Sequence, residues 1–387
     1  MFNHDTVNLD ILKRRAFNYR WATVKDGVIP LTAADPDFPC APEITEAINK
    51  FIKDRYLCYG PPEGLAECKE SISTFFEKKR NVLVTPSCVL PVDSAAFGIY
   101  LICQSFLNKG DEAVIFDPVD FLFQYSVEAV GAIPVAFSIP PGNTEIDFEL
   151  LESLISAKTK MLCICNPVNP TGKVLTEKEL LHFGKIAEKY NLLILSDEIW
   201  SDIVYSPSKY LSIASLNDQL KNRTIIVTGF SKSYGLAGLR IGAIIASNSK
   251  LFKKLFETSL HSSTIHGANI IGQVAATAAL NNSQEWLHEF LKHLQLMRDL
   301  CIERIKRIKN FSCFTPEGTY VAFVNISASG MSSAAMTEFL LEKASVAVVP
   351  GLPQWFGKGA IGYIRICFAT SDTLMNEAFN RIETFIN

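Results

Sequence analysis

The chain has 387 residues, a length that favours one large domain joined to a smaller one. Hydrophobic residues make up 48% of it and charged residues 20%, which is typical of a globular protein with large buried cores. The 37 basic and 40 acidic residues are interspersed and leave a formal net charge of −3. This balance argues against nucleic acid or an anionic membrane as a partner and favours a small molecule.

The first predicted feature is an irregular segment over residues 1–40, which ends in the turn-rich sequence AADPDFP (33–39). The sequence leaves open whether this segment returns to the C-terminal part of the chain. The segment 1–15 is charged and lacks the apolar run of a signal peptide. No later window reaches the roughly 18 apolar residues of a membrane-spanning helix, so we expect a cytoplasmic protein.

Between about residues 110 and 250, short apolar runs alternate with longer amphipathic ones. This pattern indicates β-α-β units with a mainly parallel sheet. The runs predicted as strands are 112–116, 133–137, 160–165, 192–196, 224–228 and 242–246.

The helix between the third and fourth of these strands has the clearest start, because Thr176 and Glu179 form a capping box. The two flanking strands are therefore predicted to be parallel neighbours. Toward the C-terminus the pattern changes to a long charged helix over 284–309, followed by strand-like runs at 320–326 and 363–369 with a helix between them. This change indicates a separate α/β domain.

Distinctive polar residues follow three consecutive predicted strands. Asn169 follows the third strand, Asp197 the fourth and Lys232 the fifth. In open parallel sheets, ligands bind outside the carboxyl ends of the strands. An amide, a carboxylate and an amine are therefore predicted to converge at one edge of one sheet.

These three side chains fit the needs of pyridoxal 5'-phosphate. The amine of Lys232 would form a Schiff base with the cofactor aldehyde and later act as a general base. Asp197 would keep the ring nitrogen protonated, which makes the ring an electron sink. The amide of Asn169 would donate a hydrogen bond to the phenolic oxygen.

The phosphate of such a cofactor needs hydrogen-bond donors and positive charge. Arg240, eight residues after Lys232, offers a bidentate guanidinium fork. Ser231 and a helix N-terminus near Ser87, Cys88 and Val89 are predicted to complete the phosphate site.

Each of these residues also has a purely structural interpretation. A lysine after a strand is commonly just solvated, and Asn-Pro and Pro-Thr-Gly sequences commonly form turns. Asp197 and Glu198 are compatible with a strand-end cap or a salt bridge, and Arg240 with a surface cation. The predicted cofactor site therefore depends on the combination of residues.

Motifs for other ligands do not fit. Gly172-Lys173 is not a Walker loop, because position 167 is a proline. His261 and His266 lack clustered cysteine or aspartate residues, so we assign no metal. The ten cysteines lie mostly in apolar contexts and are predicted to be buried free thiols.

Three segments, NPVNPTGKV (166–174), SDEIW (196–200) and TGFSKSYGLAGLRIG (228–242), resemble the class I/II aminotransferases among the fold-type I pyridoxal-phosphate enzymes. Their order and spacing are specific, and the resemblance extends over almost the whole chain. It implies a homodimer, and a small-molecule amino acid and 2-oxo acid as substrates.

The resemblance also implies an α/β fold with two domains. The large domain, over 46–285, would contain a mainly parallel seven-stranded sheet, and the small α/β domain would combine 1–45 and 286–387. Arg365 is similar to the residue that binds the substrate α-carboxylate, with Asn169 beside it; the alternative for Arg365 is a cation on an edge strand. Tyr59 is similar to the residue that reaches the phosphate of the neighbouring subunit.

Several positions depart from the common pattern of the family. Trp200 stands where many members have a tyrosine near the phenolic oxygen, and Gly229 replaces a residue that often carries a hydroxyl. Asp120 falls where an aromatic ring commonly stacks on the cofactor, and the adjacent Phe121 is the candidate for that role. The predicted phosphate loop, 85–91, lacks the usual glycine.

The sequence gives conflicting indications of the reaction. Segment 21–39 and Pro91 are similar to the cystathionine β-lyase-like branch of the family, whereas Arg240 resembles the aminotransferases. We favour an aminotransferase working through Lys232; the alternative is a C–S β-lyase that releases pyruvate, ammonia and a thiol, and a remote alternative is a non-catalytic pyridoxal-phosphate-binding regulator. Segment 258–268 contains no arginine, which argues against dicarboxylate specificity built on a second arginine there.

Overall fold

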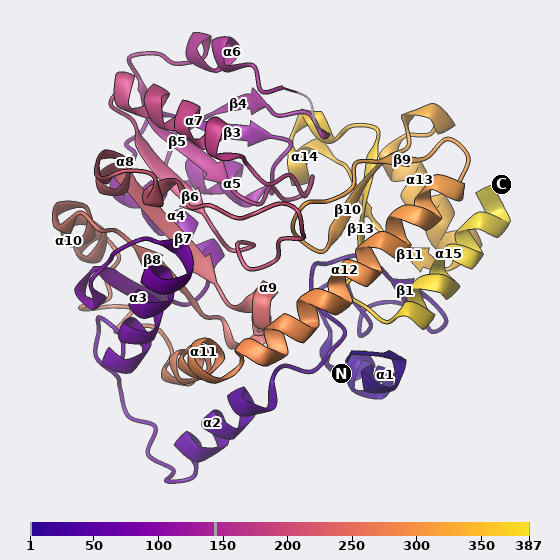
Figure 1. Ribbon diagram of the computed structural model, residues 1–387, viewed down its shortest axis with the longest axis horizontal. Coiled ribbons are helices and arrows are strands. Elements are labelled where there is room, and N and C mark those ends of the chain that lie inside the picture. Colours follow the sequence, from indigo (N-terminus) through magenta and orange to yellow (C-terminus); the bar gives the residue numbers. More distant parts are fainter. Residues whose placement is uncertain (1, 143–144, 387) are drawn as a thin grey trace.

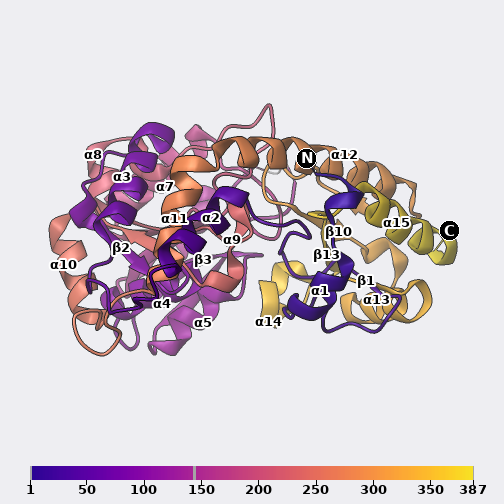
Figure 2. The same cartoon turned by 90° about the horizontal axis from the view of Figure 1, so that it is seen from below.

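The computed structural model describes residues 2–142 and 145–386 of the chain. A large seven-stranded sheet lies beside a four-stranded one, and α12 (Gln284–Arg307) crosses from the first to the second (Figures 1 and 2). A third sheet has two strands and joins the N-terminal segment to the C-terminal part of the chain.

The seven-stranded sheet has the order β2-β8-β7-β6-β5-β3-β4. Its strands are β2 (Val89–Val92), β3 (Glu112–Asp117), β4 (Ile133–Ser138), β5 (Thr159–Cys165), β6 (Leu193–Asp197), β7 (Thr224–Gly229) and β8 (Gly242–Ile245). All neighbours are parallel except β8, which is antiparallel to both β7 and β2. The prediction of a mainly parallel seven-stranded sheet is confirmed.

The six strands predicted from the sequence all exist, and the seventh, β2, was not predicted. It has only four residues and contains Pro91, so neither its length nor its pattern indicates a strand. The predicted helix start at Thr176 is also confirmed: α7 (Glu177–Lys189) begins with a capping box between Thr176 and Glu179.

Most helices around this sheet bury apolar side chains on one side and expose charged ones on the other, whereas α4 and α11 contain no charged residue. They are α2 (Pro42–Ile52), α3 (Ala66–Arg80), α4 (Ala95–Phe106), α5 (Leu122–Ala129), α6 (Phe148–Ser153), α7, α8 (Asp218–Arg223), α9 (Ser231–Tyr234), α10 (Ser249–Thr258) and α11 (Ile270–Asn282). Among them, α2 and α3 both pack on α11.

The C-terminal part of the chain is built on a sheet of order β12-β13-β10-β9. Its elements are β9 (Ser312–Cys313), β10 (Val321–Asn325), α13 (Ser333–Phe339), β11 (Val346–Ala347), β12 (Val349–Pro350), α14 (Pro353–Phe356), β13 (Tyr363–Cys367) and α15 (Asp372–Ile386).

The N-terminal segment, which contains α1 (Leu9–Arg15) and β1 (Ile29–Pro30), returns to this C-terminal part. Ile29 and Pro30 pair with Val346 and Ala347 of β11 in parallel. The question that the sequence left open is therefore answered.

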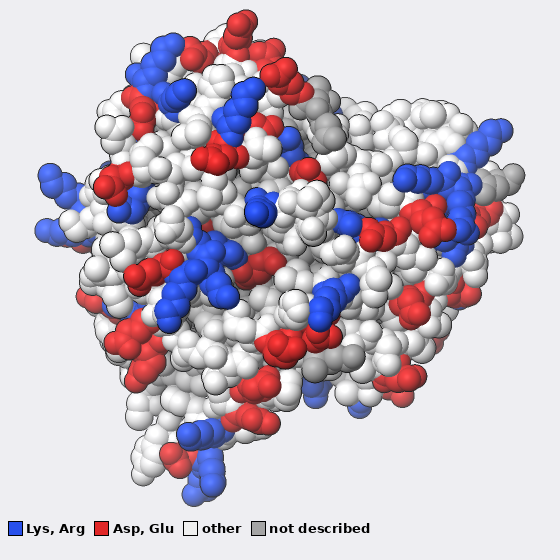
Figure 3. All heavy atoms as spheres, in the orientation of Figure 1, with Lys and Arg blue, Asp and Glu red and all other residues white. Residues whose placement is uncertain are grey.

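The surface of the described residues carries no single dominant charge on the face seen in Figure 3, where acidic and basic side chains are interspersed. No helix among these residues has both the length and the apolar character needed to cross a membrane. The ten cysteines are free thiols, and only Cys58 is exposed.

Candidate active site

The three polar residues that follow consecutive strands line one cavity. Asn169 follows β5, Asp197 is the last residue of β6, and Lys232 lies in α9 just after β7. The cavity has a volume of about 410 Å³. Its lining is completed by Asn18, Tyr19, Thr32, Ala33, Ala34, Asp120, Phe121, Leu122, Cys165, Ile199, Trp200, Val348, Val349, Trp355, Phe356 and Arg365.

The Lys232 side chain reaches across the cavity to the N-terminal segment. Its Nζ donates a hydrogen bond to the carbonyl oxygen of Ala34 at 2.5 Å and lies 5.4 Å from the centre of the Trp200 ring. Burial lowers the pKa of the Lys232 amine, although Asp35 nearby acts in the opposite direction. A lowered pKa increases the neutral fraction of the amine, which is the form that acts as nucleophile and base.

Asp197 is a buried carboxylate with spare acceptor capacity. It is only 6% exposed, and its Oδ1 accepts a hydrogen bond from the backbone N–H of Ile199 at 3.0 Å. Its Oδ2 meets only the weakly donating thiol of Cys165, at 3.9 Å. Burial raises the pKa of Asp197 to about 7, so the carboxyl group is suited to a cationic partner inside the cavity.

Asn169 connects two charged side chains of the cavity. Its Nδ2 donates to Asp120 Oδ2 at 2.8 Å, and its Oδ1 accepts from Arg365 NH1 at 3.1 Å. A carboxylate requires a donor and a guanidinium requires an acceptor, so the two neighbours fix which way the amide points. One N–H of Nδ2 remains available for a ligand.

Arg365 enters the cavity from β13 and is 7% exposed. Its guanidinium lies 5.0 Å from the centre of the Phe356 ring, and its Nε has no hydrogen-bond partner among the described residues. A buried guanidinium with unused donors is suited to a carboxylate ligand.

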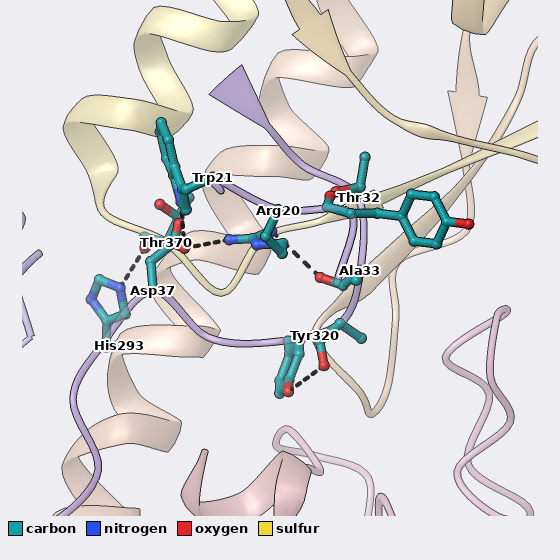
Figure 4. A network of polar contacts seen from close by, with 10 residues as sticks. Arg20, Trp21, Thr32, Ala33, Asp37, His293, Tyr320 and Thr370 are labelled. Atoms are coloured by element: carbon teal, nitrogen blue, oxygen red, sulfur yellow. Dashed lines mark hydrogen bonds and ion pairs between the residues drawn. The ribbon is translucent and has the colours of Figure 1, made fainter. Parts of the chain in front are cut away.

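Another wall of the cavity comes from the N-terminal segment, where Asn18 and Tyr19 precede β1 and residues 32–34 follow it. Figure 4 shows how it is held: the buried Arg20 NH2 pairs with Asp37 Oδ1 at 2.5 Å, and Trp21 Nε1 donates to the same oxygen at 2.7 Å. Tyr320 OH donates to Ala34 O at 3.1 Å, on the same carbonyl that accepts from Lys232.

From the sequence we expect only an irregular segment over 1–40 that ends in the turn-rich residues 33–39. The ion pair between Arg20 and Asp37 joins two coil residues and cannot be predicted from periodicity.

The predicted phosphate residues are only partly brought together. Ser231 is the first residue of α9, beside Lys232, while Arg240 is exposed in this chain and lies just before β8. Neither residue lines the cavity described above.

Ser87, Cys88 and Val89 require a correction, because they lie at the far end of β2. Val92 pairs with Gly242, which pairs with Gly229 near Lys232, whereas Val89 pairs with Ile245 at the opposite edge. These three residues are therefore separated from the lysine by the length of the strand.

The helix N-terminus that does reach this edge belongs to α4. Ser94 caps it by accepting a hydrogen bond from Phe97 N–H at 3.1 Å. A Cβ on Gly242 would lie 2.5 Å from the backbone nitrogen of Ala95, so glycine is needed for this close approach. The signal missed in the sequence was a capping serine directly after a short strand.

The remaining predicted residues have different surroundings. Trp200 is 3% exposed and packs edge-on against Tyr320 at 4.6 Å, and Phe121 lines the cavity at 40% exposure. Tyr59 is 86% exposed and contacts His266 at 4.7 Å between ring centres, on the surface of this chain.

The residues of the cavity fit a pyridoxal phosphate. Its lining combines an amine with a lowered pKa, a buried carboxylate whose Oδ2 has only a weak thiol contact among the described residues, and an amide that accepts a hydrogen bond from Arg365. An open α/β sheet with these groups at its strand ends is the arrangement of the fold-type I pyridoxal-phosphate enzymes.

Comparison with known proteins gives the same result. The family model "Aminotransferase class I and II" matches residues 26–382. The chain is 33% identical to the aspartate aminotransferase of Bacillus subtilis over 93% of its own length and 91% of that protein, and 33% identical to the aspartate aminotransferase of Pyrococcus horikoshii over 94% and 91%.

Solved structures show the same fold. The aromatic aminotransferase of Pyrococcus horikoshii OT3 superposes with a TM-score of 0.86 at 29% identity, covering 94% of this chain and 96% of that one. A pyridoxal-phosphate-bound protein from Clostridium difficile 630 has a TM-score of 0.91 at 28% identity, covering all of both chains.

Cystalysin from Treponema denticola has a TM-score of 0.89 at 24% identity over 98% of each chain, which shows the fold alone.

The chain therefore belongs to the class I and II aminotransferase family. It is a pyridoxal-phosphate-dependent aminotransferase, and of the two reactions that the sequence left open, transamination is the one that the comparisons favour over C–S lysis.

Proposed function

We propose that the enzyme moves an amino group from an amino acid to a 2-oxo acid in the cavity lined by Lys232. The observation that carries this proposal is the meeting of Lys232, Asp197 and Asn169 at one sheet edge, opposite Arg365. When bound, the pyridoxal ring supplies an aldehyde for the amine and an electron sink for the electrons released at the substrate Cα.

The residues that hold the cofactor have distinct roles in this proposal. Lys232 Nζ would hold the cofactor through its aldehyde, and Asp197 would supply a carboxylate to the ring nitrogen through Oδ2, whose one contact among the described residues is the thiol of Cys165. The remaining N–H of Asn169 donates to the phenolic oxygen. Trp200 and Phe121 are aromatic residues of the cavity lining and would be the candidates to pack against the ring.

For the phosphate we propose the N-terminus of α4 together with Ser231 and Arg240. Backbone N–H groups at a helix start and a guanidinium fork are both suited to a dianion. Arg240 is exposed in this chain, and Tyr59 lies on the same molecule's surface with Tyr56 and Leu57, which are 79% and 66% exposed.

Large exposed apolar side chains in one segment favour a protein–protein contact. We therefore propose a homodimer in which Tyr59 reaches the phosphate of the partner subunit. The cytoplasmic location stays a prediction.

The substrate would be held by its carboxylate and deprotonated by the lysine. Arg365 binds the α-carboxylate, and Asn169 holds the guanidinium in place through its Oδ1. Lys232 Nζ would then accept and hold the proton from the substrate Cα as an ammonium group, which requires an amine that is neutral part of the time. Its lowered pKa is consistent with this role.

We also propose two domains, at 46–285 and at 1–45 with 286–387. The seven-stranded sheet lies within the first range and the four-stranded sheet within the second. The boundaries fall inside α2 and at the start of α12.

The test of the reaction is a panel of amino acids given to the purified holoenzyme and scored in two ways. Transamination predicts conversion of the cofactor to its amine form with release of one equivalent of the matching 2-oxo acid. Cystathionine and cystine serve as lyase substrates, and pyruvate, ammonia and thiol released from them in many turnovers without a 2-oxo acceptor would contradict the proposal.

A further inference from the structure

The cavity contains one charged side chain that the proposed chemistry does not use. Its charged lining residues are Lys232, Asp197, Arg365 and Asp120. In the proposed function the cofactor engages Lys232 and Asp197, and the substrate α-carboxylate engages Arg365. Asp120 is left without a partner in either molecule.

Asp120 is held firmly in the lining by its surroundings. It follows β3; its Oδ1 accepts a hydrogen bond from Leu122 N–H at 3.2 Å, and its Oδ2 accepts from Asn169 at 2.8 Å. Arg365 is linked to it through Asn169, whose Oδ1 accepts from the guanidinium at 3.1 Å. The carboxylate is therefore fixed beside the place of the α-carboxylate.

Aromatic side chains make up much of the remaining lining. Tyr19, Phe121, Trp355 and Phe356 contribute rings, and Tyr19 and Trp355 lie 6.4 Å apart between ring centres. Ring faces attract cations, and a carboxylate among aromatic rings is a combination that binds ammonium or guanidinium groups. Beyond Lys232 and Arg365, the described lining offers no cation for a second substrate carboxylate.

We propose that the cavity selects amino donors with a cationic side chain, and that Asp120 is the specificity-determining residue that pairs with the ammonium or guanidinium group. This inference rests on the proposed function and names its substrate class. A substrate with a side-chain carboxylate would meet the negative charge of Asp120, so aspartate and glutamate should be poor donors, in contrast to the aspartate aminotransferases to which the chain is similar.

The ionisation of Asp120 agrees with this role. Burial raises the pKa of its carboxyl group, and the charges of Arg365 and Lys232 lower it. A substrate cation would act in the same direction as Arg365 and favour the ionised carboxylate.

The experiment compares pairs of amino donors that have the same shape but differ in charge, namely arginine with citrulline and lysine with norleucine. Single-turnover conversion of the holoenzyme should favour the cationic member of at least one pair by about tenfold or more in kcat/KM, as expected for a hydrogen bond between charged groups. In Asp120→Asn this ratio should fall to about one and glutamate should improve relative to glutamine. Asparagine keeps the shape and an acceptor oxygen for Asn169.

The matched control is Asp117→Asn, which makes the same chemical change at the last residue of β3, three positions before Asp120. Asp117 accepts a hydrogen bond from Gly359 N–H at 2.8 Å and does not line the cavity, so its variant should keep the wild-type charge preference. If Asp120→Asn lowered kcat/KM equally for the charged and the neutral member of every pair, Asp120 would only support Arg365, and the inference would be overturned.

Binding to the wild-type holoenzyme gives a readout that needs neither turnover nor a folded variant. Calorimetry should show tighter binding of 5-guanidinopentanoate than of its neutral isostere 5-ureidopentanoate; equal affinity would overturn the inference. If no amino acid yields a 2-oxo acid but this preference is found, the proposed function fails while the charge selection stands. If neutral donors are transaminated and no charge preference is found, the proposed function stands and the charge selection fails.

Discussion

Two walls of the same cavity are built in different ways. The wall that carries Asn169, Asp197 and Lys232 follows the ends of β5, β6 and β7, which hydrogen bond to one another as parallel neighbours. The N-terminal wall consists of irregular chain on either side of the two-residue strand β1, and its side chains include the buried pair of Arg20 and Asp37.

The two walls therefore respond differently to substitution. At the strand ends the backbone ladder holds each functional side chain, so a substitution there should remove a chemical group and leave the fold intact. In the N-terminal wall the backbone ladder is limited to the two residues of β1, and buried side chains such as Arg20 and Asp37 hold the irregular chain around it, so a substitution there should move the wall. Substitutions in the two walls can therefore test this contrast.

The largest effect is expected for Lys232→Ala. Proton transfer by a positioned base contributes roughly 10²- to 10⁴-fold, and the variant also loses the covalent anchor, so kcat/KM should fall by about 10⁴-fold or more. Borohydride should reduce a cofactor–protein bond in the wild type and none in the variant, as mass spectrometry of the treated proteins would show. A reducible bond that persists in the variant would place the anchor on another lysine.

The next effect is expected for Arg20→Met, which leaves Asp37 buried with only Trp21 as a side-chain donor. Breaking a buried pair in this way costs about 3–5 kcal/mol, so the free energy of unfolding measured in urea should fall by that amount. The Ala34 carbonyl, which accepts from Lys232, should also lose its fixed place.

The double variant Arg20→Met with Asp37→Asn is the control, because it removes the uncompensated charge and should recover part of the stability. If Arg20→Met proved as stable as the wild type, the wall would not depend on its ion pair and the contrast with the strand ends would fail.

The same contrast explains which parts could be predicted from the sequence. Strand ends are predictable because alternation of apolar runs locates strands, and parallel neighbours bring Asn169, Asp197 and Lys232 to one edge. The pairing of Arg20 with Asp37 joins two coil residues and follows no period, so only the structure reveals it.

The phosphate-binding residues are hard to predict for a different reason. Strand β2 is short and contains Pro91, so the sequence alone does not locate the helix start at Ser94 that follows it. The residues predicted for the phosphate lie at the other end of this strand. Asp120 was recognisable only as a departure from the aromatic residue common in the family. Its place in the cavity lining, hydrogen bonded to Asn169, depends on packing that the sequence does not encode locally.

A third prediction concerns the pH dependence of the cofactor-free protein. Burial raises the pKa of Asp197 to about 7, so between about pH 4 and 7 the folded state keeps a proton that the unfolded state has released. As the pH rises through this window, the free energy of unfolding should therefore decrease by about 1.4 kcal/mol per pH unit for this group. The free energy of unfolding, measured in urea at several pH values, should fall more steeply with rising pH in the wild type than in Asp197→Asn, by that slope. Identical slopes in the two proteins would show that Asp197 has an ordinary pKa.

The smallest effect is expected for Thr176→Ala, on the outer side of the sheet. Thr176 Oγ1 accepts a hydrogen bond from Glu179 N–H at 3.3 Å and caps α7, so its loss should cost about 1 kcal/mol of unfolding free energy. Because the strand ends are held by their ladder rather than by this cap, kcat/KM should stay at the wild-type value. Thr176→Ser keeps the hydroxyl and serves as the control. A drop in kcat/KM in Thr176→Ala alone would mean that the strand-end wall depends on helix packing as strongly as the N-terminal wall depends on Arg20.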